Sequence, residues 1–340
     1  VLTDVKNKAI KKDIIEDKKP YSCSYCYSLE KDKKSLNVVS SRVYYLKQLK
    51  EVSMHVYDDA SKFALHQVDV RWSNLCNFAC VYCGPVLSSK WASELDITID
   101  HPNNIRKQEL KDFIFSNIDQ LKNIYLAGGE PLLMKENEEF LELLLQRNPK
   151  VEVRVNTNLS NTGTKIFDLI LKFQNVHWTL SAESMGKQFE YIRYGGNWKT
   201  FLTNLETIKA TGHKITFNMV WCILNHRALF ECIDFLLNQG FHPNNFILTA
   251  ILEPGYLDIR HLPNYVLKSL KEELESRIKA RPGYLLEDGY INLLNHLTLD
   301  FNKNWTTTDN KLAELDIRRN LNRHDIFKRL YEEINYGQAI

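Results

Sequence analysis

Short apolar runs alternate with helical patterns between residues 64 and 252 of this chain. The strand patterns cover 68–72, 124–127, 151–157, 176–181, 215–223 and 246–252. The helical patterns between them cover 135–146, 165–173, 198–210 and 229–239. This alternation predicts parallel βαβ units, which either close into a barrel or form an open doubly wound sheet. In both arrangements the active site lies at the carboxyl ends of the strands.

The segments on either side of this α/β region show helical patterns without the alternating strand patterns. Residues 1–62 are polar and rich in lysine, with a helical pattern over 40–51 and an expected loop around Cys23. Beyond residue 254 the helical patterns cover 264–280, 285–297 and 311–334. We therefore expect three parts: an N-terminal segment over 1–62, an α/β core over 63–254 and a C-terminal helical extension over 255–340.

The composition excludes several classes of protein. The 340 residues carry 44 Lys and Arg against 42 Asp and Glu, so the net charge of +2 gives no signal for a nucleic-acid partner. No apolar run approaches the roughly 18 residues that span a bilayer. A signal-peptide pattern is also missing, so we expect a cytoplasmic protein without a membrane partner. Because the chain begins at Val1 rather than Met, we expect further residues upstream.

Seven cysteines cannot all pair, and in a reducing compartment metal binding or catalysis is a better default than disulfides. Cys76, Cys80 and Cys83 follow the first strand with C-x3-C-x2-C spacing. Three thiolates fit one cubane iron-sulfur cluster and leave one iron open to another ligand, whereas a structural zinc site needs a fourth protein ligand. A zinc site completed elsewhere and unrelated core thiols are the alternatives.

With Tyr82 just before its last cysteine, this motif resembles the signature of the radical SAM superfamily. The resemblance implies a [4Fe-4S] cluster whose open iron binds the amino and carboxylate groups of S-adenosyl-L-methionine (SAM). It also implies reductive cleavage of SAM to a 5'-deoxyadenosyl radical and a partial (β/α)6 barrel of the TIM type. Tyr82 would then lie against the adenine; its alternative is a packing aromatic.

A glycine pair follows the second predicted strand, in the stretch Ala127-Gly128-Gly129-Glu130. Two glycines allow a backbone to approach a ligand closely, although a turn that merely ends the strand is the alternative. The resemblance implies that this stretch holds the SAM amino group, with Glu130 as its anionic partner.

Polar residues also stand where later strands end. Asn158, Ser181 and Glu183 occupy positions that face a barrel mouth, although short polar residues form turns for local reasons as well. The resemblance implies SAM contacts for Asn158 and Ser181, while Glu183 stands where relatives commonly carry Asp. It also implies that Arg193, in Tyr-Ile-Arg-Tyr-Gly, reaches the SAM carboxylate; a surface salt bridge is the alternative. Leu252 would cover the adenine or pack in the core.

A second pair of cysteines, Cys23 and Cys26, precedes the core in a C-x2-C-Tyr-x2-Glu stretch. Two thiolates do not complete a zinc or cluster site, and the context of a redox C-x-x-C motif is missing. The stretch resembles the segment that precedes the barrel in SPASM/twitch members, where upstream cysteines complete an auxiliary iron-sulfur cluster. Either this chain lacks those ligands, or the pair is a zinc knuckle or two free thiols. Cys222 and Cys232 are expected in the core.

The favoured hypothesis is a radical SAM enzyme that draws electrons from a flavodoxin or ferredoxin and removes a hydrogen atom from its substrate. The cofactors supply the chemistry, so the fold does not specify the substrate. Peptide maturation is one possibility, and a small metabolite or nucleotide derivative is the other. No residue acting on the substrate is predicted. The rival class is a non-catalytic α/β binding protein structured by zinc or a cluster.

Overall fold

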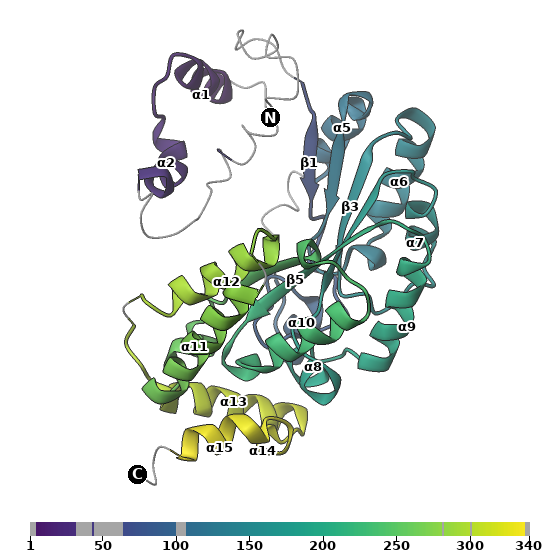
Figure 1. Ribbon diagram of the computed structural model, residues 1–340. Helices are drawn as coiled ribbons and strands as arrows, with labels where there is room; N and C mark the ends of the chain where they lie inside the picture. Colours follow the sequence, from purple (N-terminus) through teal and green to yellow (C-terminus); the bar gives the residue numbers. More distant parts are fainter. Residues whose placement is uncertain are drawn as a thin grey trace. The chain divides into compact units, whose positions relative to one another are not determined.

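The computed structural model describes residues 5–31, 43, 64–99, 107–280, 282–299 and 301–336 (Figure 1). The chain divides into two compact units, one made of Val1–His66 and Gln108–Gln120, the other of Gln67–Lys107 and Leu121–Ile340. Apart from Val43, the helix predicted over 40–51 lies outside the described residues. None of the helices in the described ranges has both the length and the apolar character that crossing a membrane requires.

The first unit is helical where it is described. Its elements are α1 (Val5–Ile15), a 3-10 turn (Tyr21–Cys23), α2 (Ser24–Lys31), most of α5 (Lys107–Ser116) and a second 3-10 turn (Ile118–Gln120). The loop predicted around Cys23 is therefore wrong, because Cys23 ends the first turn and Cys26 lies within α2. Pro20, with φ of −58°, sets the start of this turn, and the eight residues after Cys23 contain no glycine or proline to stop a helix.

The second unit is built on a parallel sheet of six strands in sequential order. The strands are β1 (Gln67–Val70), β2 (Asn123–Leu126), β3 (Glu152–Thr157), β4 (Val176–Ser181), β5 (Lys214–Trp221) and β6 (Phe246–Ala250). Each strand pairs only with its neighbours in the chain, so β1 and β6 remain the two edges. The predicted parallel βαβ units are confirmed, and the sheet is a partial barrel that does not close.

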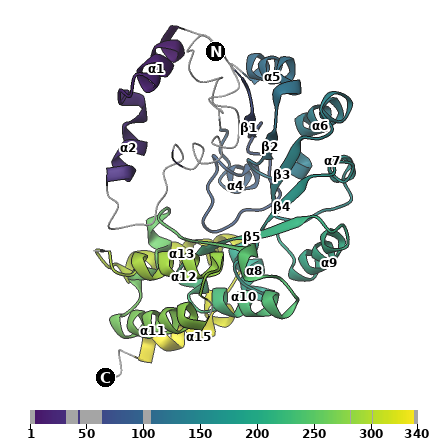
Figure 2. The same cartoon turned by 45° about the horizontal axis from the view of Figure 1, so that its top comes forward.

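Helices connect the successive strands. They are α4 (Ser89–Glu94), α6 (Lys135–Arg147), α7 (Lys165–Ile170), α8 (Gly186–Ile192), α9 (Trp198–Lys209) and α10 (Ala228–Asn238). Figures 1 and 2 show α6, α7 and α9 in a row along one face of the sheet. Alternate residues of β4 are buried, and the ring centroid of Trp178 lies 5.4 Å from that of Phe167 in α7. The opposite face of β3 and β4 carries the half-buried polar side chains of Asn156, Thr179 and Ser181.

The C-terminal part is helical, as predicted, but its last helix is interrupted. The elements are α11 (Asn264–Ala280), α12 (Leu285–His296), α13 (Trp305–Arg319), α14 (Arg323–Ile326) and α15 (Lys328–Tyr336). A single helix over 311–334 is wrong, because Asn320 adopts the left-handed conformation (φ 50°) and ends α13. A Cβ on Gly289 of α12 would lie 2.9 Å from Leu248 Cγ, so this helix packs closely on β6.

Candidate functional site

The loop that follows β1 carries Cys76, Cys80 and Cys83, and backbone hydrogen bonds fix its conformation. The amide of Ala79 donates to Tyr194 O at 2.8 Å, and the amide of Val81 donates to Ile192 O at 2.8 Å. Both acceptors lie at the end of α8 and in the connection to α9. The backbone on either side of Cys80 is therefore bonded to a segment that lies more than a hundred residues further along the chain.

Helix α4 supports the same loop from a second side. The indole Nε1 of Trp91 donates to Cys80 O at 2.7 Å, and Ser89 Oγ lies 3.1 Å from Cys76 N and 3.2 Å from Cys76 O. Ser88 caps α4 by accepting a hydrogen bond from Trp91 N. Sequence reasoning missed Trp91 and Ser89, because a tryptophan and a serine on a short helix carry no motif of their own.

The three thiols differ in their electrostatic surroundings. A hydrogen bond with Cys83, aided by the positive charge of Arg193, lowers the pKa of the buried Cys80 thiol to about 7. That same hydrogen bond, together with burial, raises the pKa of Cys83. Burial raises the pKa of Cys76 to about 11. Since thiolates are the form that binds metal, the loop places one of three soft ligands close to its binding state at neutral pH.

The donor set is compatible with an iron-sulfur cluster by its chemistry. A structural zinc site needs a fourth protein ligand, whereas three thiolates can bind a four-iron cluster and leave one iron open to another ligand. Cys76, Cys80 and Cys83 supply three such sulfurs on one loop, and none of them is in a disulfide.

The glycines after β2 lie directly against the cysteine loop. Gly128 has φ of +114°, and a side chain on Gly129 would place its Cβ 2.1 Å from Leu75 O. The next amide, that of Glu130, donates to Leu75 O at 2.7 Å. The protein itself therefore requires glycine here, which gives this stretch a structural role whatever it binds.

Glu130 is buried, and protein donors surround its carboxylate. Thr157 Oγ1 donates at 2.7 Å, Asn158 N at 2.7 Å and Leu132 N at 3.1 Å. Burial raises the pKa of Glu130, and these hydrogen bonds oppose the shift. A carboxylate offers about four lone-pair sites, so three donors leave room for one more. This geometry is compatible with the predicted ammonium partner.

Asn158 joins Glu130 to the cysteine loop. Its backbone amide binds Glu130, while its side-chain Nδ2 donates to Asn77 Oδ1 at 3.0 Å and lies 4.0 Å from Cys76 Sγ. Ser181 ends β4 on the face that also carries Thr179. Asn158 therefore lies at the cysteine loop, and Ser181 lies at the carboxyl edge of the sheet.

Tyr82, which is half-buried, forms a second group beside the loop with the buried Glu183 and Arg193. The Tyr82 hydroxyl is hydrogen-bonded to both Glu183 Oε1 and Arg193 Nη1, and the two charged side chains lie 3.4 Å apart. Burial raises the pKa of Glu183, and the adjacent guanidinium opposes this. The surface salt bridge considered for Arg193 is wrong, because its side chain is only 6% exposed. Its Nε has no hydrogen-bond partner among the described residues.

The remaining predicted residues differ in how exposed they are. Leu252 follows β6 with 65% of its surface exposed, so the alternative of core packing is wrong. Cys222 and Cys232 are fully buried, which confirms their place in the core. Cys23 and Cys26 are half-buried in the first unit, and within the described ranges they are not part of a metal-ligating group.

Comparisons with known proteins were made once this geometry was established. Residues 70–236 match the model of the Radical SAM superfamily. GTP 3',8-cyclase of Nautilia profundicola is 27% identical over 236 residues, which cover 66% of this chain and 70% of that relative. GTP 3',8-cyclase of Sulfurimonas denitrificans is 29% identical over 171 residues, which cover 48% of this chain and 50% of that relative. The matches thus span 50% to 70% of the length of these relatives.

Solved structures with a related arrangement were also found. One, described as native anSMEcpe with bound AdoMet, has a TM-score of 0.46 and 15% identity, and the match covers 64% of this chain and 63% of that chain. Another is Streptococcus suis SuiB bound to S-adenosylmethionine, with a TM-score of 0.43 and 15% identity over 76% of this chain and 55% of that chain.

Proposed function

Because residues 70–236 make this chain a member of the radical SAM superfamily, we propose that it binds its [4Fe-4S] cluster through Cys76, Cys80 and Cys83 and acts on a nucleotide. The observation that carries the proposal is the rigid cysteine loop beside Glu130 and Arg193. When bound, the cluster supplies the electron that cleaves SAM to methionine and a 5'-deoxyadenosyl radical, which removes a hydrogen atom from the substrate.

The loop's own contacts support the first part of the proposal. Hydrogen bonds with the connection after α8 and with Trp91 of α4 hold the backbone at Cys80 in place. Ligands held in this way lose little conformational entropy on binding, which favours assembly of the group. Arg193 adds a positive charge that favours the thiolate of Cys80.

The charges beside the loop support binding of the amino-acid part of SAM. Glu130 offers a buried carboxylate to an ammonium, and Arg193 offers a buried guanidinium to a carboxylate. The unpartnered Nε of Arg193 is a donor that a carboxylate ligand would satisfy. The proposed SAM-binding residues also include Asn158, Ser181, Tyr82 and Leu252. Glu183 would hold Arg193 in position through their ion pair.

The names of the relatives favour a nucleotide over a peptide as the substrate. Both relatives named above are GTP 3',8-cyclases. The sheet face opposite α6, α7 and α9 carries amide and hydroxyl groups on Asn156, Thr179 and Asn218, and the buried Asn156 Oδ1 has no partner within the described part of the chain. Such groups suit the hydrogen-bonding edges of a base or ribose.

The proposal extends to electron supply and the N-terminal cysteines. A flavodoxin or ferredoxin would provide the electron, and Cys23 and Cys26 would contribute two ligands to an auxiliary cluster. Replacement of both by alanine should then lower the iron content of the protein without preventing assembly at the Cys76–Cys83 loop.

Deuterium transfer tests the substrate class. The reconstituted protein is incubated with dithionite, SAM and nucleoside triphosphates carrying deuterium in the ribose, and 5'-deoxyadenosine is analysed by mass spectrometry. We expect deuterium in the product with at least one nucleotide. If 5'-deoxyadenosine forms without deuterium from any of them, the nucleotide proposal fails while SAM cleavage stands.

A further inference from the structure

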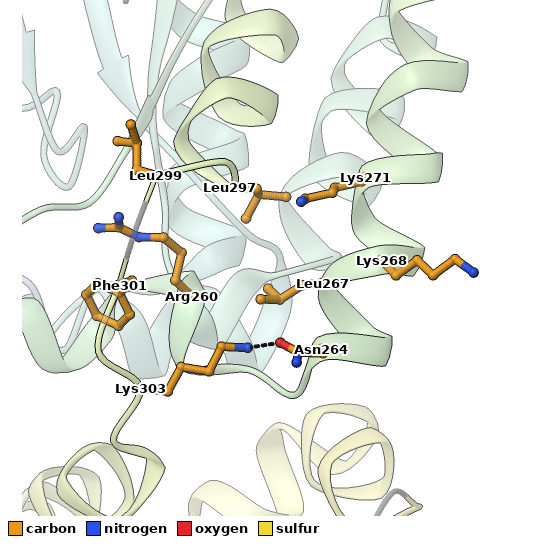
Figure 3. Close-up of a pocket in the computed structure, with 9 residues that line it drawn as sticks. All are labelled: Arg260, Asn264, Leu267, Lys268, Lys271, Leu297, Leu299, Phe301 and Lys303. Carbon is orange, nitrogen blue, oxygen red and sulfur yellow. Dashed lines mark hydrogen bonds between the residues drawn. The ribbon is translucent and has the colours of Figure 1, made fainter. Parts of the chain in front are cut away.

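A pocket of about 350 Å³ lies between α11 and the connection from α12 to α13, away from the site described above (Figure 3). It contains none of the cysteine-loop residues or their partners. Its apolar wall is formed by Leu267, Leu297, Leu299 and Phe301, and its polar residues are Arg260, Asn264, Lys268, Lys271 and Lys303.

The described lining residues include four cations and no acid; Asp300, between the lining residues Leu299 and Phe301, lies outside the described residues. Arg260 is already neutralised, because Asp258 accepts hydrogen bonds from its Nε at 2.9 Å and its Nη2 at 2.7 Å. Lys268 lines the pocket, but its ammonium points away from it in Figure 3. Among the described lining residues, Lys271 and Lys303 therefore remain as the charges available to a ligand.

Neutral groups hold Lys303 in place. Its Nζ donates to Leu262 O at 2.9 Å and to Asn264 Oδ1, the bond drawn in Figure 3. Two of its three N–H donors are thereby used without neutralising its charge. Burial lowers the pKa of Lys303, and the positive charge of Lys271 lowers it further. An anion bound between these two positive charges would offset their repulsion.

We propose that this pocket binds a small organic phosphate. Two lysines acting as point charges suit a phosphate group, and the leucines with Phe301 suit an apolar or aromatic part of the same ligand. The volume falls within the range of about 300 to 1,000 Å³ that is usual for small-molecule sites and is too small for a folded partner. The inference does not depend on the proposed substrate.

Isothermal titration calorimetry with phenyl phosphate and with inorganic phosphate tests this proposal on the full chain. We expect saturable 1:1 binding, tighter for phenyl phosphate, that weakens as salt concentration rises. The variant K271Q/K303Q should lose at least tenfold in affinity, whereas Lys279→Gln, which removes a charge elsewhere on α11, should bind as the wild type does.

Thermal unfolding of the double variant verifies that it is folded, and its yield of 5'-deoxyadenosine should equal that of the wild type. The proposal is overturned if no saturable binding occurs or if the folded double variant binds phenyl phosphate as tightly as the wild type. These outcomes are independent of whether the chain acts on a nucleotide, because binding is measured without SAM or reductant.

Discussion

Gly129 connects the glycine motif to the cysteine loop through a purely steric requirement. A Cβ at this position would stand 2.1 Å from Leu75 O and 2.7 Å from Asn74 C, both backbone atoms that cannot move without shifting the loop. Gly84 follows Cys83 in the same loop, yet nothing lies within 4 Å of its Cβ position. A side chain is therefore sterically excluded at Gly129, whereas the space around Gly84 would admit one.

Gly129→Ala should destabilise the fold by about 1–3 kcal/mol, because the loop must move to admit one methyl group. The same change at Gly84 should alter the free energy of unfolding by less than about 1 kcal/mol. Urea unfolding of both variants measures the difference. Equal stabilities of the two variants would contradict the close contact between Gly129 and the cysteine loop.

His177 makes the stability depend on pH. Burial, helped by the charges of Lys214 and Arg154, lowers the pKa of this histidine from 6.5 to about 4. The unfolded chain therefore takes up a proton at a higher pH than the folded chain does, and the free energy of unfolding falls as pH drops from about 6.5 to about 4.

His177→Gln removes this contribution and keeps a partner for Thr216 Oγ1, which lies 2.7 Å from the ring. Between pH 7 and pH 4 the variant should lose about 1.5 kcal/mol less than the wild type, roughly half the full linkage value because the ring is partly exposed. Parallel curves for the two proteins across this range would refute the assignment.

The sequence motifs predicted those site residues that are close in sequence to cysteines, glycines or the ends of strands. Glu130, Asn158 and Arg193 were all indicated in this way, and the structure brings them to the cysteine loop. Trp91 was not, because its role is a single hydrogen bond to Cys80 O that only the folded chain creates. Long-range contacts of this kind leave no local pattern.

Among the elements, α13 makes an unexpected contact with the supports of the cysteine loop. The side chain of its Arg319 is only 1% exposed, and Nε donates to Glu94 Oε1 at 3.0 Å. The guanidinium carbon Cζ of Arg319 lies 4.5 Å from the ring centroid of Trp91 and 4.4 Å from that of Tyr194. Trp91 and Tyr194 both bind the loop backbone. Arg319 of α13 thus contacts both α4 and the connection after α8, the two segments that hydrogen-bond to the cysteine loop.

Arg319→Met should cost on the order of 3 kcal/mol, because it leaves Glu94 without its buried partner. It should also lower the amount of iron bound on reconstitution, since both supports of the loop loosen. Arg318→Met is the control: Arg318 is 35% exposed and 3.7 Å from Glu94, so its loss should change stability by less than about 1 kcal/mol. Similar effects for the two variants would contradict this role of Arg319.

Element prediction succeeded where periodicity and length agreed. All six strands and the helices α6, α9, α10, α11 and α12 were predicted within about three residues at each end. The short helix α8 was missed, because seven residues give too little periodicity to recognise. The break at Asn320 was also missed, because an asparagine in the left-handed conformation is one of several outcomes that the sequence permits there.

At the scale of the whole molecule, the second unit gathers the candidate site at one edge of its sheet. The cysteine loop follows β1, the glycine motif follows β2, Asn158 follows β3 and Glu183 follows β4. Parallel strands in sequential order place these four connections side by side, which is why a few motifs spread over more than a hundred residues indicated a single site.

The central claim is that this edge holds a cluster that cleaves SAM, and anaerobic reconstitution tests it. The protein should bind about four irons at the loop and form 5'-deoxyadenosine with dithionite and SAM. Cys80→Ala should lose the product while remaining folded, whereas Cys232→Ala, which changes a core thiol, should retain it. A colourless, zinc-loaded protein that yields no 5'-deoxyadenosine, or a Cys80→Ala variant that is as active as the wild type, would contradict the account.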